Sequence, residues 1–302
     1  MDPLIDAVCK GGFEMVKHLI STGVEYQINN LFTIVSKNGH LEIVMYLHRE
    51  LGADINCDDG LPVRLASFFG HLDVVMYLCE NGATIECIYN SAVEWACQNG
   101  HLEIVKYLVK MGADILNSNY CSLIWASDYG YLPVVKYLCE AGVDFQRYDE
   151  LAIKRASQNG HYEVVKYLCE LGADFRNDND YAIRWASWGG YIQVVKYLFE
   201  LGADIKSEDN FAIRKASDAD YIDVVIYLYE NGADISKITE KHRKYILFCE
   251  KMKNKVRDKA QKKIYFWWIP ICYSLSHHSG CGKRMMMKNL KKAQELGLDL
   301  IE

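Results

Sequence analysis

The stretch QNGHYEVVKYLCELGADF, residues 158–175, decides how this chain folds, because close copies of it recur along the sequence. The copies are QNGHLEIVKYLVKMGADI at 98–115, DYGYLPVVKYLCEAGVDF at 128–145 and WGGYIQVVKYLFELGADI at 188–205. From residue 70 onward they are spaced thirty residues apart. Self-similarity at a fixed period of this size is typical of a solenoid built from one repeated supersecondary element.

Two columns of glycine punctuate the repeats. The exit glycines follow the second apolar segment of each repeat and are Gly23, Gly52, Gly82, Gly112, Gly142, Gly172, Gly202 and Gly232. The turn glycines separate the two halves of each repeat and are Gly12, Gly39, Gly70, Gly100, Gly130, Gly160 and Gly190, with Asp220 in the eighth position. Because glycine adopts positive φ without steric penalty, we expect the exit glycines to end helices in the left-handed conformation.

Each repeat is predicted to contain two short helices. Around residue 190, the first covers stretches such as 182–187 and ends at Gly189 and Gly190, and the second runs from about Ile192 to Glu200. Apolar residues of the second helix recur at helical spacing and form one face. A helix pair of this length cannot bury its apolar face alone. About eight repeats are therefore expected to stack into an all-α solenoid over residues 1–235.

The motif G-H-x-E-V-V-K-Y-L-x-E-x-G-A-D-I resembles the second helix and exit turn of ankyrin repeats, and the resemblance covers residues 4–235. It implies an ankyrin-repeat solenoid that serves as a non-enzymatic protein–protein interaction module. The period of thirty replaces the family's usual thirty-three, and the missing residues come from the hairpin finger, which is shortened. The family's Thr-Pro-Leu-His signature is replaced by Tyr181-Ala-Ile-Arg184, Leu151-Ala-Ile-Lys154 and Phe211-Ala-Ile-Arg214, while Leu61-Pro-Val-Arg64 keeps the proline.

The short repeat, with Tyr-Leu in place of Leu-Leu, is similar to ankyrin proteins of giant DNA viruses of amoebae (mimivirus-like). This second resemblance implies a viral protein that acts in the host cytoplasm.

The ankyrin resemblance also implies that a protein partner meets the concave face, built from finger tips and the exposed end of each first helix. The two positions before each turn glycine vary strongly between repeats, while the framework beside them does not. Large aromatic side chains dominate interface hot spots. We predict partner-binding residues at Phe68, Phe69, Gln98, Asn99, Asp128, Tyr129, Gln158, Asn159 and Trp188.

Other recurring side chains are interpreted as framework. Trp95, Trp125 and Trp185 lie beside an invariant alanine column, so we predict packing at the seam between repeats and not a recognition strip. The recurring histidines are replaced by tyrosine in other repeats, so we interpret them as turn residues and not as metal ligands or bases. Several cysteines share a column with Val, Phe and Tyr, so we interpret them as small apolar packing residues. Catalysis needs one convergent group of unlike side chains. We therefore predict no enzymatic activity, no metal site and no cofactor.

Composition predicts a cytoplasmic protein. Half of the 302 residues are hydrophobic, no apolar run reaches the length of a transmembrane helix, and the N-terminus lacks the apolar core of a signal peptide. The eleven cysteines are odd in number and fit a reducing compartment. The net charge of −6 divides into −16 over residues 1–235 and +10 over residues 236–302. We therefore predict a second part, a basic C-terminal extension at 236–302.

The extension is predicted to begin with a basic helix from Thr239 to about Lys262 that caps the solenoid, with Tyr245, Phe248, Met252 and Val256 on its apolar face. Residues 264–275 are expected to pack against this cap, or else to expose an aromatic patch for a protein interface or a membrane-surface contact. A last helix is expected to cover about 283–296. Cys272, His277, His278 and Cys281 form an alternative zinc-ligand set that lacks a paired Cys-x-x-Cys. Gly280-Cys-Gly-Lys283 departs from a phosphate-binding loop at its first glycine and its Ser/Thr.

Two other functions compete with a simple binding module. One is a viral adaptor whose C-terminal segment recruits host machinery such as a cullin-type ubiquitin ligase, although residues 236–302 contain no legible F-box signature. The other is nucleic-acid contact through the basic tail, which the acidic array disfavours because it repels a polyanion. The partner's identity and the oligomeric state are open at this point.

Overall fold

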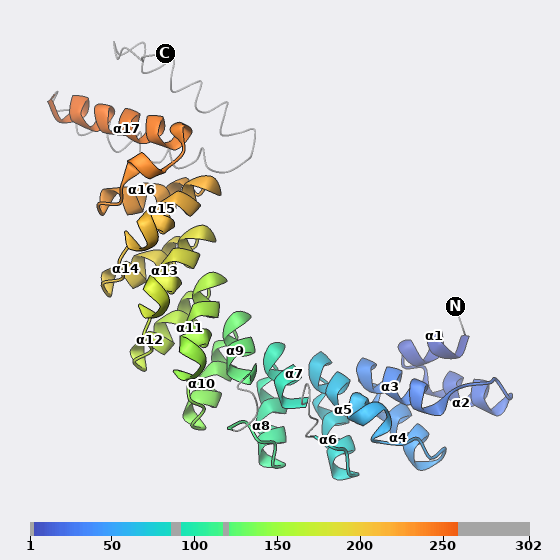
Figure 1. Ribbon diagram of the computed structural model, residues 1–302. Coiled ribbons are helices and arrows are strands. Elements are labelled where there is room, and N and C mark those ends of the chain that lie inside the picture. The colour runs from blue at the N-terminus through green and yellow to red at the C-terminus, as the bar shows by residue number, and fades with distance from the viewer. Residues whose placement is uncertain (1–2, 86–91, 117–120, 259–302) are drawn as a thin grey trace. The chain divides into compact units, whose positions relative to one another are not determined.

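The computed structural model describes residues 3–85, 92–116 and 121–258, with backbone alone at 121, 147–149 and 252–258. All regular elements in these ranges are helices, which confirms the all-α solenoid (Figure 1). The chain divides into two compact parts, which we call the N-lobe (Met1–Asp174) and the C-lobe (Phe175–Glu302). The array boundary at residue 235 stays a prediction. The segments 264–275 and 283–296, the zinc-ligand set and the Gly280–Lys283 loop lie outside the described residues.

In the N-lobe, first helices stack on first helices and second helices on second helices. The first helices are α1 (Pro3–Cys9), α3 (Ile28–Asn38), α5 (Cys57–Phe69), α7 (Ala92–Gln98), α9 (Cys121–Asp128) and α11 (Arg147–Gln158). The second helices are α2 (Phe13–Ser21), α4 (Leu41–Arg49), α6 (Leu72–Glu80), α8 (Leu102–Lys110), α10 (Leu132–Glu140) and α12 (Tyr162–Glu170).

The C-lobe continues the same pattern and then departs from it. Two full repeats come first, and a longer helix follows a short 3₁₀ turn. Its elements are α13 (Asn177–Trp188), α14 (Ile192–Glu200), α15 (Ser207–Asp218), α16 (Ile222–Glu230), η1 (Ile235–Lys237) and α17 (Glu240–Asp258).

The core lies between the two rows of helices. Val194, Val195 and Leu198 of α14 are completely buried, as the predicted apolar face requires. Burying each such side chain contributes about 1.5–3 kcal/mol. Between successive first helices the buried residue is an alanine, which lets the helices approach closely. Stacking of repeats therefore supplies the apolar burial that one helix pair lacks.

Six glycines at the turn within a repeat each lie beneath a ring of the following repeat: Gly11, Gly39, Gly70, Gly100, Gly130 and Gly190. Gly70 has φ 86°, and a Cβ atom there would lie 2.6 Å from Cε1 of His101. The His101 ring also hydrogen-bonds, through Nε2, to the carbonyl oxygen of Phe68 at 3.0 Å. The recurring His/Tyr residue is thus a contact between repeats. In the first repeat this place belongs to Gly11, with φ 71° beneath His40, so the predicted member Gly12 was wrong by one residue.

Where shortened hairpin fingers were predicted, three described turns contain a single turn of left-handed helix. Three consecutive residues have φ between 50° and 73° at 58–60, 178–180 and 208–210. Eight of these nine residues are Asp, Asn or Gly, the types that tolerate this conformation best. The loss of three residues per repeat therefore removes the hairpin itself at these places.

The arginine that stands where the ankyrin signature has histidine holds this left-handed turn. Arg184 donates a hydrogen bond to the carbonyl oxygen of Asp178 at 2.7 Å, six residues earlier. The side chain of Asp180, at the end of the turn, accepts from the backbone N–H of Asp204 in the next repeat at 3.0 Å. Equivalent arginine bonds are Arg64 to Asp58 and Arg214 to Glu208, both 3.1 Å.

Comparing an exit glycine with a turn glycine gives a prediction in which the first substitution is the control for the second. Gly82, an exit glycine with φ 93°, has nothing near the place of a Cβ atom, whereas Gly70 has the His101 ring. Gly82→Ala is expected to lower the free energy of unfolding by about 1–2 kcal/mol through backbone strain alone. Gly70→Ala adds overpacking, about 1–3 kcal/mol more. Urea unfolding followed by circular dichroism checks this, and equal losses would show that the ring contact is unimportant.

Cysteine reactivity gives a second prediction. Burial raises the pKa of Cys79 and Cys139 to about 11 and of Cys97 and Cys169 to about 12, while Cys9 is exposed. The thiolate is the reactive form, so at about pH 8 we expect iodoacetamide to label Cys9 roughly 100-fold faster. Peptide mass spectrometry reads each site separately, and labelling in concentrated guanidinium chloride is the control. Similar labelling rates at Cys9 and at the other four cysteines in the folded chain would contradict the packing role predicted for the cysteines.

Candidate functional site

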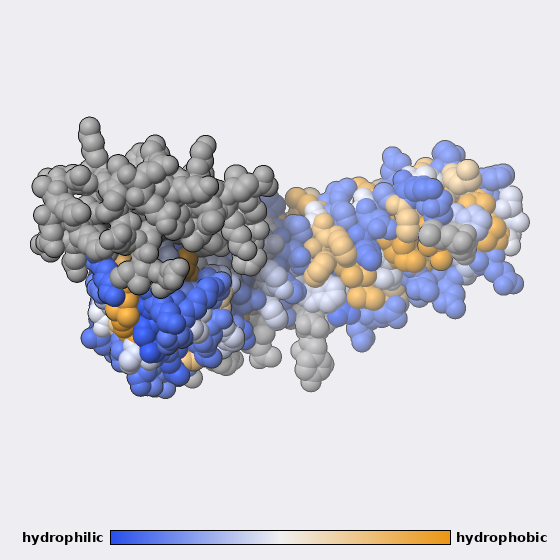
Figure 2. Space-filling view, turned by 90° about the horizontal axis from the view of Figure 1, so that it is seen from above, coloured by the Kyte–Doolittle hydropathy of each residue, from blue (hydrophilic) through white to orange (hydrophobic). Residues whose placement is uncertain are grey.

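The first helices carry the most exposed aromatic side chains of the N-lobe on their outer side. Phe69 is 43% exposed, Trp125 38% and Tyr129 47%. Figure 2 looks down on this row of helices and shows apolar residues exposed in patches between hydrophilic ones. We call this surface, in either lobe, the first-helix face.

Phe69 packs against a neighbouring ring, which in turn contacts a tryptophan. Phe68 is half-buried and packs edge-on against Phe69 and Trp95, with ring centroids 4.9 and 5.4 Å apart. The ammonium of Lys37 lies 5.2 Å from the Phe69 ring centroid. Of the two adjacent phenylalanines predicted to bind, Phe69 therefore presents its surface to solvent and Phe68 mainly fixes its orientation.

A second aromatic group lies two repeats further along the N-lobe. Tyr129 is stacked between Trp125 and Tyr131, at centroid distances of 6.2 and 6.4 Å. Offset stacking of this kind adds about 0.5–1.5 kcal/mol beyond the buried area. Tyr129 is consequently exposed and at the same time held in one orientation.

In the C-lobe the predicted residue Trp188 belongs to a group of four rings. Trp188 is 43% exposed and lies 4.4 Å from Trp185, which in turn stacks on Tyr181 at 5.2 Å. Phe211 of the following first helix lies 6.2 Å from Trp185. The guanidinium of Arg184, fixed by its bond to the left-handed turn, lies 5.3 Å from the Phe211 ring.

Two members of the tryptophan column pack between repeats, as predicted. Trp95 contacts Phe68 of the preceding repeat, and Trp185 contacts Phe211 of the following one. Both are half-buried, whereas Trp125 is exposed. All three also belong to the first-helix face, where each contacts a predicted binding residue. For Trp125 and Trp185 the sequence carried a signal for this, because they precede Tyr129 and Trp188 by four and three residues, a spacing that places each pair on one helix face.

The polar candidates are largely engaged within the chain. Asn99 donates to the carbonyl oxygen of Trp95 at 3.0 Å, and Asn159 donates to both the carbonyl oxygen and the carboxylate of Asp128. Gln158 accepts from Arg155 at 3.3 Å. Gln98 is half-buried. The side chains of Asn99, Asn159 and Gln158 thus already have hydrogen bonds within the chain, so the aromatic residues offer more to binding.

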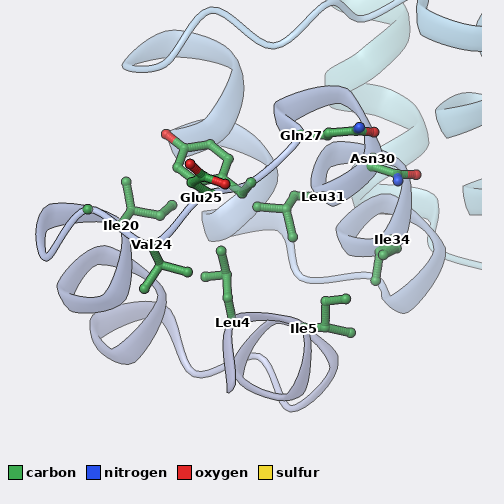
Figure 3. Close-up of a pocket in the computed structure, with 11 residues that line it drawn as sticks. Leu4, Ile5, Ile20, Val24, Glu25, Gln27, Asn30, Leu31 and Ile34 are labelled. Atoms are coloured by element: carbon green, nitrogen blue, oxygen red, sulfur yellow. The ribbon is translucent and has the colours of Figure 1, made fainter. Parts of the chain in front are cut away.

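One cleft opens at the N-terminal end of the N-lobe, with a volume of about 690 Å³. Its wall combines α1, α2 and α3 with the connecting segment 23–27, and Figure 3 shows Leu4, Ile5, Val24 and Leu31 lining it. Glu25, Gln27 and Asn30 are its polar members. The lining supplies apolar surface but no pair of groups arranged for acid–base or nucleophilic chemistry.

Ser217, His242 and Asp220 make one grouping that resembles a catalytic triad in composition. His242 lies 2.8 Å from both Ser217 Oγ and an Asp220 carboxylate oxygen. Ser217 and His242 are both buried, however, so the hydroxyl is not presented to a substrate. The geometry also lacks a site near the hydroxyl where a reacting atom and oxyanion donors meet.

In residues 3–85, 92–116 and 121–258, no group of three or more His, Cys, Asp or Glu side chains is arranged to hold a metal ion. No helix within those ranges is long and apolar enough to cross a bilayer.

Comparisons with known proteins agree with the repeat geometry. A family model described as ankyrin repeats matches residues 4–89, 86–149 and 153–239. The crystal structure of the human ASB11 ankyrin repeat domain is similar with a TM-score of 0.54 and 23% identity, covering 70% of this chain and 96% of that one. At this identity the likeness concerns the fold alone. No curated protein matches the chain.

Proposed function

The chain belongs to the ankyrin-repeat family, a non-enzymatic interaction fold whose repeats generally mediate protein–protein contacts, and we propose that this chain binds a protein partner on its first-helix face. We propose this face as the one that the ankyrin resemblance implies for a partner, taken in each lobe by itself. Its anchors are Phe69, Tyr129 and Trp188, with Phe68, Trp125 and Trp185 as supporting rings.

The observation that carries the proposal is the packing of another aromatic ring against each exposed anchor side chain. Exposed aromatic side chains are enriched among interface hot spots, and a side chain held in its binding orientation loses less entropy on association. Each of the three anchors contacts at least one further ring of its own lobe. Neutral sequence drift at exposed positions would instead give isolated aromatic residues that no other ring contacts.

The test compares two triple variants of the full chain. Phe69→Ala/Tyr129→Ala/Trp188→Ala removes the anchors, and Met111→Ala/Leu171→Ala/Leu201→Ala removes apolar residues of similar exposure (43%, 42% and 42%) at the exit turns. We expect a partner captured from amoebal cytosol by the natural chain to bind the anchor variant at least about 30-fold more weakly, and the control variant unchanged.

Circular dichroism of both variants ensures that folding is preserved. Equal binding by the anchor variant and the natural chain would reject the first-helix face. Equal loss in both variants would place the contact elsewhere on the array.

The adaptor function is the second candidate, favoured by the change in charge at residue 236, where an acidic array meets a segment of net +10. In this version the array selects a protein and residues 236–302 recruit host machinery such as a cullin-type ubiquitin ligase. Viral origin and host cytoplasm belong to the same proposal. Affinity purification with the full chain and with residues 1–235 separates the candidates, because an adaptor loses one set of partners while keeping another.

Nucleic-acid contact through the basic tail is the remaining candidate. It predicts binding that weakens steeply as salt rises, since neutralised phosphates release counterions. A fluorescent oligonucleotide titrated at two salt concentrations would detect it. Binding that is weak and insensitive to salt argues against this role.

A further inference from the structure

Asp220 breaks the turn-glycine column at the last full repeat of the C-lobe. It has φ 66° and occupies the position at which Gly190 precedes it by thirty residues. Residues with a Cβ atom adopt this conformation at a cost of about 1–2 kcal/mol, although Asp tolerates it better than most. The substitution therefore either reflects tolerated drift or is balanced by contacts that a glycine could not make.

A side chain at this position is incompatible with a further repeat of the standard kind. At Gly190 a Cβ atom would lie 2.5 Å from the ring of Tyr221, thirty-one residues later. The residue thirty-one positions after Asp220 is Lys251, so no such ring follows. The framework contact that joins one repeat to the next is thus missing at this end.

Helix α17 supplies different contacts to the same position. Lys241 Nζ lies 2.6 Å from one Asp220 carboxylate oxygen, and His242 Nε2 lies 2.8 Å from the same oxygen. The neighbouring Lys241 lowers the pKa of the Asp220 carboxyl, with desolvation acting against it, so the ionised form is favoured. The stability that the ionised Asp220 carboxylate contributes is present above the usual carboxyl pKa, and it is lost as the pH falls through the lowered pKa of Asp220.

Ser217 also changes its partner at this end. Its equivalents Ser67 and Ser187 hydrogen-bond back to a carbonyl of their own helix. Ser217 Oγ instead accepts from the backbone N–H of Thr239 at 3.1 Å and lies 2.8 Å from His242 Nδ1. Both ring nitrogens of the buried His242 therefore have a hydrogen-bond partner, Nε2 the Asp220 carboxylate and Nδ1 the Ser217 hydroxyl.

The register of α17 matches that of a first helix. Among the residues of α17 whose side chains are described, His242 and Ile246 are buried, and they lie thirty residues after Ala212 and Ala216, the buried alanines of α15. Of the apolar face predicted for this helix, Tyr245 and Phe248 are half-buried, and the side chains of Met252 and Val256 lie outside the described residues. Tyr229 of α16 donates a further hydrogen bond to Glu250.

We propose that Asp220 is a latch that docks α17 on the last full repeat in place of the first helix of a ninth. The latch consists of Asp220, Lys241 and His242, with Ser217 and Thr239 completing its buried side. It assigns a docking role to the one residue that departs from the turn-glycine column, and it is independent of which partner the first-helix face binds.

Asp220→Gly in the full chain tests the latch sharply, because glycine is the regular residue of this column and relieves the backbone strain. We expect amide hydrogen exchange at residues 240–251 to become at least about tenfold faster, while amides of α13 and α14 keep their rates. The matched control is Asp218→Asn, which removes an exposed carboxylate two residues away whose partner is Lys215.

The opposite result is equally clear. If Asp220→Gly leaves exchange at 240–251 within twofold of the natural chain, or slows it, Asp220 is merely tolerated and the latch is rejected. The same conclusion follows if Asp218→Asn accelerates exchange as much as Asp220→Gly does. Ser217→Ala is a second test of the latch, and we expect it to accelerate amide hydrogen exchange at residues 240–251.

Discussion

The contact between a turn glycine and the His or Tyr ring of the next repeat is the constraint on which the other features depend. It requires a residue with positive φ and no side chain on one repeat, and a flat ring on the other. The ring nitrogen of each histidine also meets a carbonyl near the end of the preceding first helix. Since both conditions recur every thirty residues, the apolar faces of successive helix pairs are brought together at a constant spacing, and burial follows.

Shortening the repeat changes which surface is available to a partner. A full hairpin finger would project beyond the first helices, but the described turns replace it with one left-handed turn held by an arginine of the same repeat. Among the described residues, the first-helix face of each lobe then carries exposed aromatic side chains such as Phe69, Tyr129 and Trp188. The arginine serves two purposes in the C-lobe, because Arg184 both fixes its turn and lies against the ring of Phe211.

The aromatic residues of this face combine exposure with restraint. A solenoid framework cannot vary at its seams without losing stacking, so variation is confined to positions such as Phe69, Tyr129 and Trp188 that no neighbouring repeat needs. The supporting rings of Tyr129 and Trp188 lie one helical turn earlier, and that of Phe69 is the adjacent Phe68. A rigid frame with variable anchors is the arrangement expected of a surface that recognises another protein.

The sequence alone determined the repeat, its helix pairs and the positions that vary, because glycine spacing and apolar periodicity are local properties. The second helix around residue 192 begins and ends where it was predicted. The tertiary structure decided matters that depend on contacts between repeats. It left Trp125 of the tryptophan column exposed, engaged Asn99 and Asn159 in framework bonds, and put left-handed turns at three places where shortened hairpins were predicted. It also gave Asp220 its partners, since a residue at 220 and helix α17 meet only after the chain has turned back on itself.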